Sequence, residues 1–368
     1  MSCWRSLRAQ TVVCCAATCK PLRRGILDPS FRRRRLAILA AANDNDGYDF
    51  DPAALVGFSY RLTVVRGRHW GWIDTADSAH VVEPVASWMP SRDGLVKATL
   101  ERWARLGVGN GSAVAKLHVW DALAGSATSL PAITVSEDHY PLALLNVGAT
   151  DRSFELLVVD RIFSSRTGRW SADRAAYYPP LLYGHLAQTH PAFVGRTAHW
   201  LCRRGSSDLN VVLALNLDSP VATMLELPPG CSTMVSSSIY ANEILLASVG
   251  GRLSCLVAES SALTVSVWTL TSAWPEASWS RQAVVSVREM ERSAGLRFHT
   301  TSLLLEGFGE RSGAVMLQMS DGALVRLDLG TKQATMYERK QKEPCGWATR
   351  VCLYEIDLAS VLKAMKSF

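Results

Sequence analysis

Histidine is the residue of this sequence that would most readily supply a base or a metal ligand. His199 stands beside Trp200 in a run of strand-forming residues. An imidazole could act there as a general base, but we expect a half-buried strand histidine whose ring bonds to a neighbouring strand. His185 and His190 are five residues apart, which matches no common zinc-ligand spacing. The histidines therefore predict neither a catalytic residue nor a metal site.

Cysteine occurs nine times without the spacing of a metal or redox site. No Cys-x-x-Cys pair is present, and no histidine is placed to complete a zinc-ligand set. An odd count without a disulfide framework is typical of a reducing compartment, where a buried cysteine behaves as a small hydrophobic residue. We expect no catalytic residues, no metal and no cofactor, and therefore a protein that is not an enzyme.

The positive charge is concentrated at the start of the chain. The net charge is +6, but residues 1–35 hold nine Lys and Arg residues against Asp28 alone, so they carry +8 and residues 36–368 carry −2. Arg32–Arg35 is either a nuclear-import or phosphate-binding patch or a solvated run that closes a helical segment. The aromatic and basic interleaving of a single-strand nucleic-acid groove is not evident, so nucleic acid is not an expected partner.

Short β-type runs dominate from Leu55 onward. Gly, Asp, Asn, Ser or Pro separates them about every ten residues, which is typical of a β-sandwich, barrel or propeller. The expected strands are Leu62–Val65, Ala79–Val85, Lys116–Trp120, Phe154–Val159, Asn210–Leu217, Ile244–Val249, Leu253–Val257, Leu263–Leu270, Ala314–Met319, Leu324–Leu329 and Val351–Ile356.

Three segments predict helices. Residues 7–27 carry one apolar stripe at helical spacing that Pro21 interrupts. Val96–Arg105 is the main helical candidate within the β-rich region. Leu358–Met365 has one apolar helical face, although a frayed tail explains this last segment equally well.

A recurring unit organises the β-rich region. A strand that ends in a turn is followed by a Leu-Pro or Trp element, at Leu130-Pro131, Trp170, Leu227-Pro228 and Trp279. Successive units start about 40–60 residues apart, and a four-stranded propeller blade takes about 40–50 residues. We therefore predict a mainly β fold, a β-propeller of about six to seven blades. Two stacked β-sandwich domains are the alternative.

The propeller prediction divides the chain into four parts. Residues 1–42 form a short helical segment, and residues 43–54 form a polar linker around Asn43-Asp44-Asn45-Asp46-Gly47. Residues 55–356 form the propeller. Residues 357–368 form a C-terminal helix. The longest apolar run near the start is far shorter than the ~20 residues that a membrane span needs, so we expect no membrane association.

The stretch Gly195–Leu270 carries a family resemblance. Gly195-x-x-Ala-His199-Trp200-Leu, an Ala-Leu-Asn-Leu strand, a Leu-Pro turn, Gly250-Gly251-Arg-Leu and Val-Ser-Val-Trp268 follow in order. This succession resembles the F-box-associated β-propeller of plants, and these six numbered residues are its fold signature. The resemblance implies a fold that binds other proteins.

The N-terminal segment is similar to the second half of an F-box. The matching residues are Cys15, Cys19, Leu22, Ile26 and Phe31, within a stretch that also holds Asp28-Pro29. In that family, this half docks on a Skp-type adaptor. The usual opening, Leu-Pro-x-Asp and a Leu-rich helix, does not precede these residues, so we expect an F-box whose N-terminal half is missing and whose adaptor docking is impaired.

The two resemblances imply a substrate receptor of an SCF-type cullin–RING ubiquitin ligase, which binds an unknown protein target on the loop face of its propeller. One alternative is a β-propeller interaction protein with no ligase role, and another is an enzyme that uses a propeller channel. We expect a cytoplasmic or nuclear protein, or both. The Arg-rich residues 1–27 are also compatible with an organelle transit peptide.

Overall fold

The structure of the protein is a computed structural model, and it is mainly β. It describes Phe50 and residues 55–66, 71–74, 95–105, 112–121, 126–136, 142–147, 153–158, 161–171, 191–203, 210–219, 222–231, 243–272, 277–295, 297–298, 300–320, 323–337 and 347–355. The expected helices over residues 7–27 and Leu358–Met365, the linker apart from Phe50, and the expected strand Ala79–Val85 lie outside these described residues.

Four consecutive sheets share one simple antiparallel topology. In each, four strands that follow one another in sequence also lie side by side, because each strand is hydrogen-bonded to the next one. The first two of these sheets contain β7 (Leu142–Val147), β8 (Phe154–Val158), β9 (Arg161–Ser164) and β10 (Arg169–Trp170), and β11 (Ala192–Val194), β12 (Thr197–Arg203), β13 (Asn210–Asn216) and β14 (Ala222–Leu225). The next two contain β15 (Ile244–Val249), β16 (Arg252–Glu259), β17 (Thr264–Ser272) and β18 (Ser278–Ser286), and β19 (Leu303–Phe308), β20 (Ala314–Met319), β21 (Leu324–Asp328) and β22 (Ala334–Tyr337).

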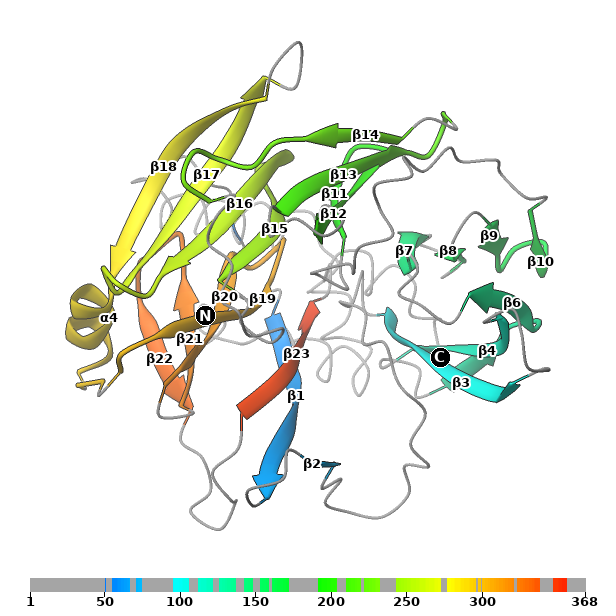
Figure 1. Cartoon of the computed structure of the whole chain (residues 1–368), viewed down its shortest axis with the longest axis horizontal. Helices are drawn as coiled ribbons and strands as arrows, with labels where there is room; N and C mark the ends of the chain where they lie inside the picture. The colour runs from blue at the N-terminus through cyan, green and yellow to red at the C-terminus, as the bar shows by residue number, and fades with distance from the viewer. Residues whose placement is uncertain are drawn as a thin grey trace, which may run out of the picture.

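Two further sheets complete the described fold. One contains β3 (Leu95–Arg105), β4 (Ser112–Asp121), β5 (Ser126–Ser129) and β6 (Ile133–Ser136), with β4 paired to the other three. The other contains β1 (Leu55–Arg66), β2 (Gly71–Asp74) and β23 (Trp347–Glu355), with β1 in the middle. Figure 1 shows that the six sheets follow one another around the molecule in chain order.

The strand predictions are confirmed wherever the residues are described, because each expected run overlaps a strand.

The helix predicted at Val96–Arg105 is wrong, since this segment is strand β3. Its apolar residues Val96, Leu100 and Trp103 recur at helical spacing. The pairing of β3 with β4 shifts register between Val96 and Ala98 and again between Trp103 and Arg105. Such irregularities break the strict alternation of a strand.

Apolar residues cover both faces of the central sheets. Successive strand residues point to opposite faces, so on β12 the neighbours Trp200 and Leu201 enter two different cores. Trp200 packs with residues of the two preceding sheets, and Leu201 packs against the following sheet. β16 repeats this arrangement, with Cys255 in one core and Leu256 in the next. The β11–β14 and β15–β18 sheets are therefore held on both sides by their neighbours.

Tryptophan side chains connect neighbouring sheets at the recurring Leu-Pro elements. The Trp170 indole on β10 donates a hydrogen bond to the Pro131 carbonyl of the preceding sheet at 3.1 Å. The Trp279 indole on β18 donates to the Glu226 carbonyl, just after β14, at 2.9 Å. The two elements that define the repeat in the sequence therefore contact each other between consecutive sheets.

The single α-helix among the described residues, α4 (Val287–Ala294), was not expected from the sequence. It follows β18 and contacts β18 and β22. Ser286 and Glu289 form a capping box at its start, and Gly295 ends it in the left-handed conformation. Val287 and Met290 are buried and fix the helix to the core between the β15–β18 and β19–β22 sheets.

Gly250 and Gly251 form a two-residue hairpin between β15 and β16. Their φ angles are 56° and 72°, and Val249 pairs with Arg252 across the turn. Two positive φ angles in succession are typical of a type I′ turn, which favours Asn-Gly and Gly-Gly. The Gly-Gly pair of the sequence is therefore explained by the turn.

We predict that Gly251→Ala lowers the free energy of unfolding by about 1 kcal/mol, because a side chain disfavours positive φ. An added Cβ would meet no atom within 4 Å, so the cost is that of the backbone alone. Gly250→Asn is the matched control and should be nearly neutral, since Asn-Gly suits this turn. Denaturant unfolding measures both, and equal effects of the two substitutions would contradict the turn assignment.

Candidate functional site

His199 and Trp200 lie side by side on β12, where the fold makes both of them structural. His199 is 6% exposed, and its Nδ1 lies 3.3 Å from the Ala192 carbonyl oxygen on neighbouring β11. Burial lowers the pKa of His199, which favours a neutral ring. Trp200 is fully buried in the core shared with the two preceding sheets. Gly195 lies in the β11–β12 turn with a φ of 58°.

Trp268 lies in a small polar network on the β15–β18 sheet. Its indole donates to Ser266 Oγ at 3.2 Å, and Ser266 in turn donates to Glu259 Oε1 at 3.2 Å. Arg281 pairs with the same carboxylate oxygen at 2.8 Å, and its guanidinium carbon lies 5.5 Å from the Trp268 ring centre. The charges of Glu259 and Arg281 therefore pair with each other within the network, and Trp268 has a structural role.

The adaptor-binding residues expected from the sequence, Cys15, Cys19, Leu22, Ile26 and Phe31, lie outside the described residues. Their role stays a prediction.

Among the residues that the structure does describe, no group of three or more His, Cys, Asp or Glu side chains is arranged to hold a metal ion. Within the same part of the chain, no helix combines the length and apolarity that a membrane crossing requires.

Glu306 is a buried carboxyl group within an apolar strand. It lies on β19 at a register shift between Leu305 and Gly307, and burial raises its pKa to about 8. Its Oε2 has no hydrogen-bond partner among the described residues, and neither polar atom of the Gln318 amide on β20 has one. An unpaired buried polar group costs roughly 1–3 kcal/mol. These two residues therefore weaken the sheet in which they lie.

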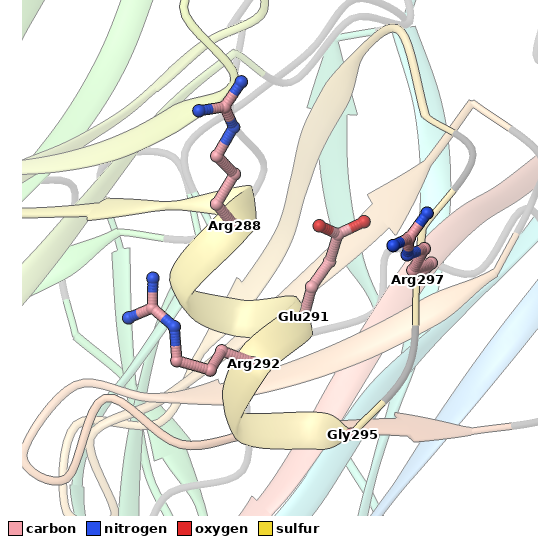
Figure 2. Close-up of a pocket in the computed structure, with 5 residues that line it drawn as sticks. All are labelled: Arg288, Glu291, Arg292, Gly295 and Arg297. Atoms are coloured by element: carbon pink, nitrogen blue, oxygen red, sulfur yellow. The ribbon is translucent and has the colours of Figure 1, made fainter.

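An open hollow beside α4 brings charged side chains of the described residues together. It has a volume of about 330 Å³ and is lined by Arg288, Glu291, Arg292, Gly295 and Arg297. Figure 2 shows Glu291 between Arg297 on one side and the two helical arginines on the other. All three arginines are exposed. Three guanidinium groups against one carboxylate make this hollow positively charged, and we call it the α4 hollow.

Hydrogen bonds hold the frame of the α4 hollow in place. Glu291 Oε1 accepts a hydrogen bond from the Phe298 amide at 2.7 Å, which folds the segment after the helix back against it. The Ala334 amide on β22 donates to Ser293 Oγ at 2.9 Å. The arginines therefore project from a fixed backbone, and their geometry is suited to binding anions.

The sequence contained a signal for α4 that the strand pattern concealed. Ser286 and Glu289 match the Ser-x-x-Glu capping box, Val287, Met290 and Ala294 follow helical spacing, and Gly295 is a typical helix end. The preceding apolar run belongs to a strand, so the helix begins without a loop. Recognition of this signal would have placed Arg288 and Arg292 on one helix and Arg297 just after it.

Comparison with known proteins gives a family and distant structural likenesses. The family described as "Domain of unknown function (DUF7595)" matches residues 76–368. None of the curated proteins matches the chain.

Several solved structures are similar to this chain at low sequence identity and low TM-score. The periplasmic gluconolactonase PpgL of Pseudomonas aeruginosa is 14% identical, with 78% of this chain and 84% of that chain covered and a TM-score of 0.36. A DUF4784 family protein of Bacteroides caccae is 13% identical, with 81% and 74% covered and a TM-score of 0.37. A chain of the mitotic checkpoint complex is 13% identical, with 61% of each chain covered and a TM-score of 0.28.

We predict that Glu306→Gln stabilises the protein at high pH and changes little near pH 5. The pKa of Glu306 is about 8 in the folded protein, against an ordinary value of 4.5. Between these two pH values the carboxyl group is protonated in the folded state and ionised in the unfolded state. Stability is then lost as the pH rises through this interval. Near pH 8 the variant should gain on the order of 3 kcal/mol, less any cost of the buried amide.

Thermal melts from about pH 5 to pH 8 measure this difference. Glu226→Gln removes an exposed carboxylate and serves as the control, which should follow the pH dependence of the unmodified protein. If the melting temperature of the Glu306→Gln variant depended on pH in the same way as that of the control, the prediction that a buried Glu306 ionises in this range would be wrong.

We predict that Cys202, Cys231 and Cys255 resist thiol reagents in the native protein at about pH 8. All three are free and buried. Burial raises the pKa of Cys202 to about 12 and that of Cys231 to about 11, and it raises the pKa of Cys255 well above its ordinary value. The thiolate is the reactive form. Mass spectrometry after labelling measures the extent of reaction at each cysteine, and denatured protein is the control. Rapid labelling of these three cysteines in the native protein would contradict their buried positions.

Proposed function

Starting from the membership of this chain in the DUF7595 family of domains of unknown function, we propose that it is a protein-interaction module built on a β-propeller. The observation that carries the interaction role is the α4 hollow. Arg288 and Arg292 project from α4 and Arg297 from the segment after it, and buried residues and hydrogen bonds anchor the helix and this segment. A fixed, charged and open surface of this kind suits recognition of another protein.

The propeller part of the proposal rests on topology. Six sheets follow one another in chain order, and the four from β7 to β22 repeat the same four-stranded arrangement. Apolar cores lie between consecutive sheets. β1 and β23 come from opposite ends of the described chain and pair in one sheet, with Leu55 opposite Glu355. Pairing of the first and last described strands supports a ring of six blades, an architecture that leaves only short, protected sheet edges.

The role within the cell follows from the resemblance to F-box-associated proteins. We expect a substrate receptor of an SCF-type ubiquitin ligase, in which the propeller positions a target and this chain performs no chemistry. Cys15, Cys19, Leu22, Ile26 and Phe31 would dock on the Skp-type adaptor. The second candidate is an interaction protein without a ligase role. The α4 hollow favours this candidate because it needs no adaptor to be a binding surface.

We predict that a fusion carrying a complete F-box opening half before residue 1 captures a purified Skp-type adaptor. Leu22→Asp with Ile26→Asp in that fusion should abolish capture, because two charges would enter an apolar docking face. Gln10→Asp with Thr11→Asp is the control for added charge. Capture is measured by pull-down and then by calorimetry.

The unmodified chain separates the two candidate roles. We expect capture of the adaptor by the fusion to exceed capture by the unmodified chain at least tenfold. Failure of the fusion as well as the unmodified chain would exclude the receptor role and leave the interaction protein without a ligase function.

A further inference from the structure

We infer that the α4 hollow is the docking site for an acidic peptide segment of a partner protein, an inference that rests on the proposed interaction function. Within the described part of the chain, Arg288, Arg292 and Arg297 form no ion pair and no side-chain hydrogen bond. Two other exposed cations of the fold differ in this respect: Arg196 pairs with Asp218 at 2.6 Å, and Arg281 pairs with Glu259 at 2.8 Å.

The carboxylates near the three arginines are already used by the protein. Glu291 accepts the Phe298 amide through Oε1. Glu289 accepts from the Ser286 amide and hydroxyl, which lower its pKa first, with smaller contributions from Lys332 and Arg292. These carboxylates brace the helix and the segment after it. The guanidinium groups therefore remain available to an anionic ligand from outside.

The geometry favours several separate carboxylates over one compact anion. In Figure 2 the arginine side chains diverge, with Arg288 and Arg292 on one side of Glu291 and Arg297 on the other. A peptide segment can place one acidic side chain at each guanidinium, and each can form paired N–H···O bonds. A single phosphate or sulfate in the middle of the hollow would face the Glu291 carboxylate.

The charge distribution of the chain also favours an acidic peptide over nucleic acid. Residues 36–368 sum to −2, so the positive charge at α4 is local. Nucleic acid is normally bound by an extended basic face that neutralises many phosphates. A hollow of about 330 Å³ with one carboxylate in its middle accommodates a short peptide segment better than a duplex or a long strand.

The test is binding of a fluorescent peptide of alternating Glu and Ser to the purified full chain, measured by anisotropy at low salt. The hollow variant carries Arg288→Gln, Arg292→Gln and Arg297→Gln, and the control variant carries Arg166→Gln, Arg169→Gln and Arg252→Gln, which remove the same charge from other exposed positions. We expect the hollow variant to bind at least tenfold more weakly and the control variant to bind within about twofold of the unmodified chain. Binding should weaken as salt is raised.

Three outcomes would overturn the inference: no binding by the unmodified chain, equal losses in both variants, or tighter binding of a single-stranded oligonucleotide of equal charge that the hollow variant abolishes. Thermal melts of both variants establish that they fold, since the substituted residues are exposed. The assay contains no adaptor. A failure here therefore leaves the receptor and interaction roles to the pull-down experiment, and a failure of that experiment leaves the peptide site standing.

Discussion

The fold depends on apolar packing between consecutive sheets, because the central sheets have two apolar faces that their neighbours cover. Trp200 and Leu201, adjacent on β12, enter different cores, and Cys255 and Leu256 do the same on β16. Buried apolar area contributes roughly 25 cal/mol per Å², so these contacts outweigh the isolated polar ones. The Trp170 and Trp279 hydrogen bonds then fix the position of one sheet against the previous one.

Burial on both faces determines where polar groups can act. Three carboxylates of the described residues, Glu306, Asp328 and Glu355, are buried. Asp328 accepts a hydrogen bond from the Thr331 amide and Glu355 accepts one from the Ser312 amide, whereas Glu306 Oε2 has no partner among the described residues, at a cost to stability. The arginines of the α4 hollow meet solvent instead. The sheets therefore provide the stability of the fold, and the exposed positive charge lies on a different part of the chain, at α4.

Most of the β structure could be predicted from the sequence because the strands are short apolar runs bounded by turn residues. The prediction failed at Val96–Arg105, where irregular pairing with β4 produced helical spacing in a strand. It missed α4 because the helix follows β18 without an intervening loop. The α4 hollow could not be predicted, since it arises only when Glu291 draws the segment with Arg297 back along the helix. His199 could be placed on a strand, but its buried position required the tertiary structure.

The pairing of β1 with β23 has a consequence for the synthesis of the protein. β1 leaves the ribosome before its partner β23, and the strands of five other sheets are made between the two. Until then, the edge of β1 that will meet β23 has unsatisfied backbone groups, which can pair with another chain. The nascent chain is thus exposed to misassembly while these five sheets are made. A chaperone that covers β1 during this period would protect the yield of folded protein without contributing anything to its final stability.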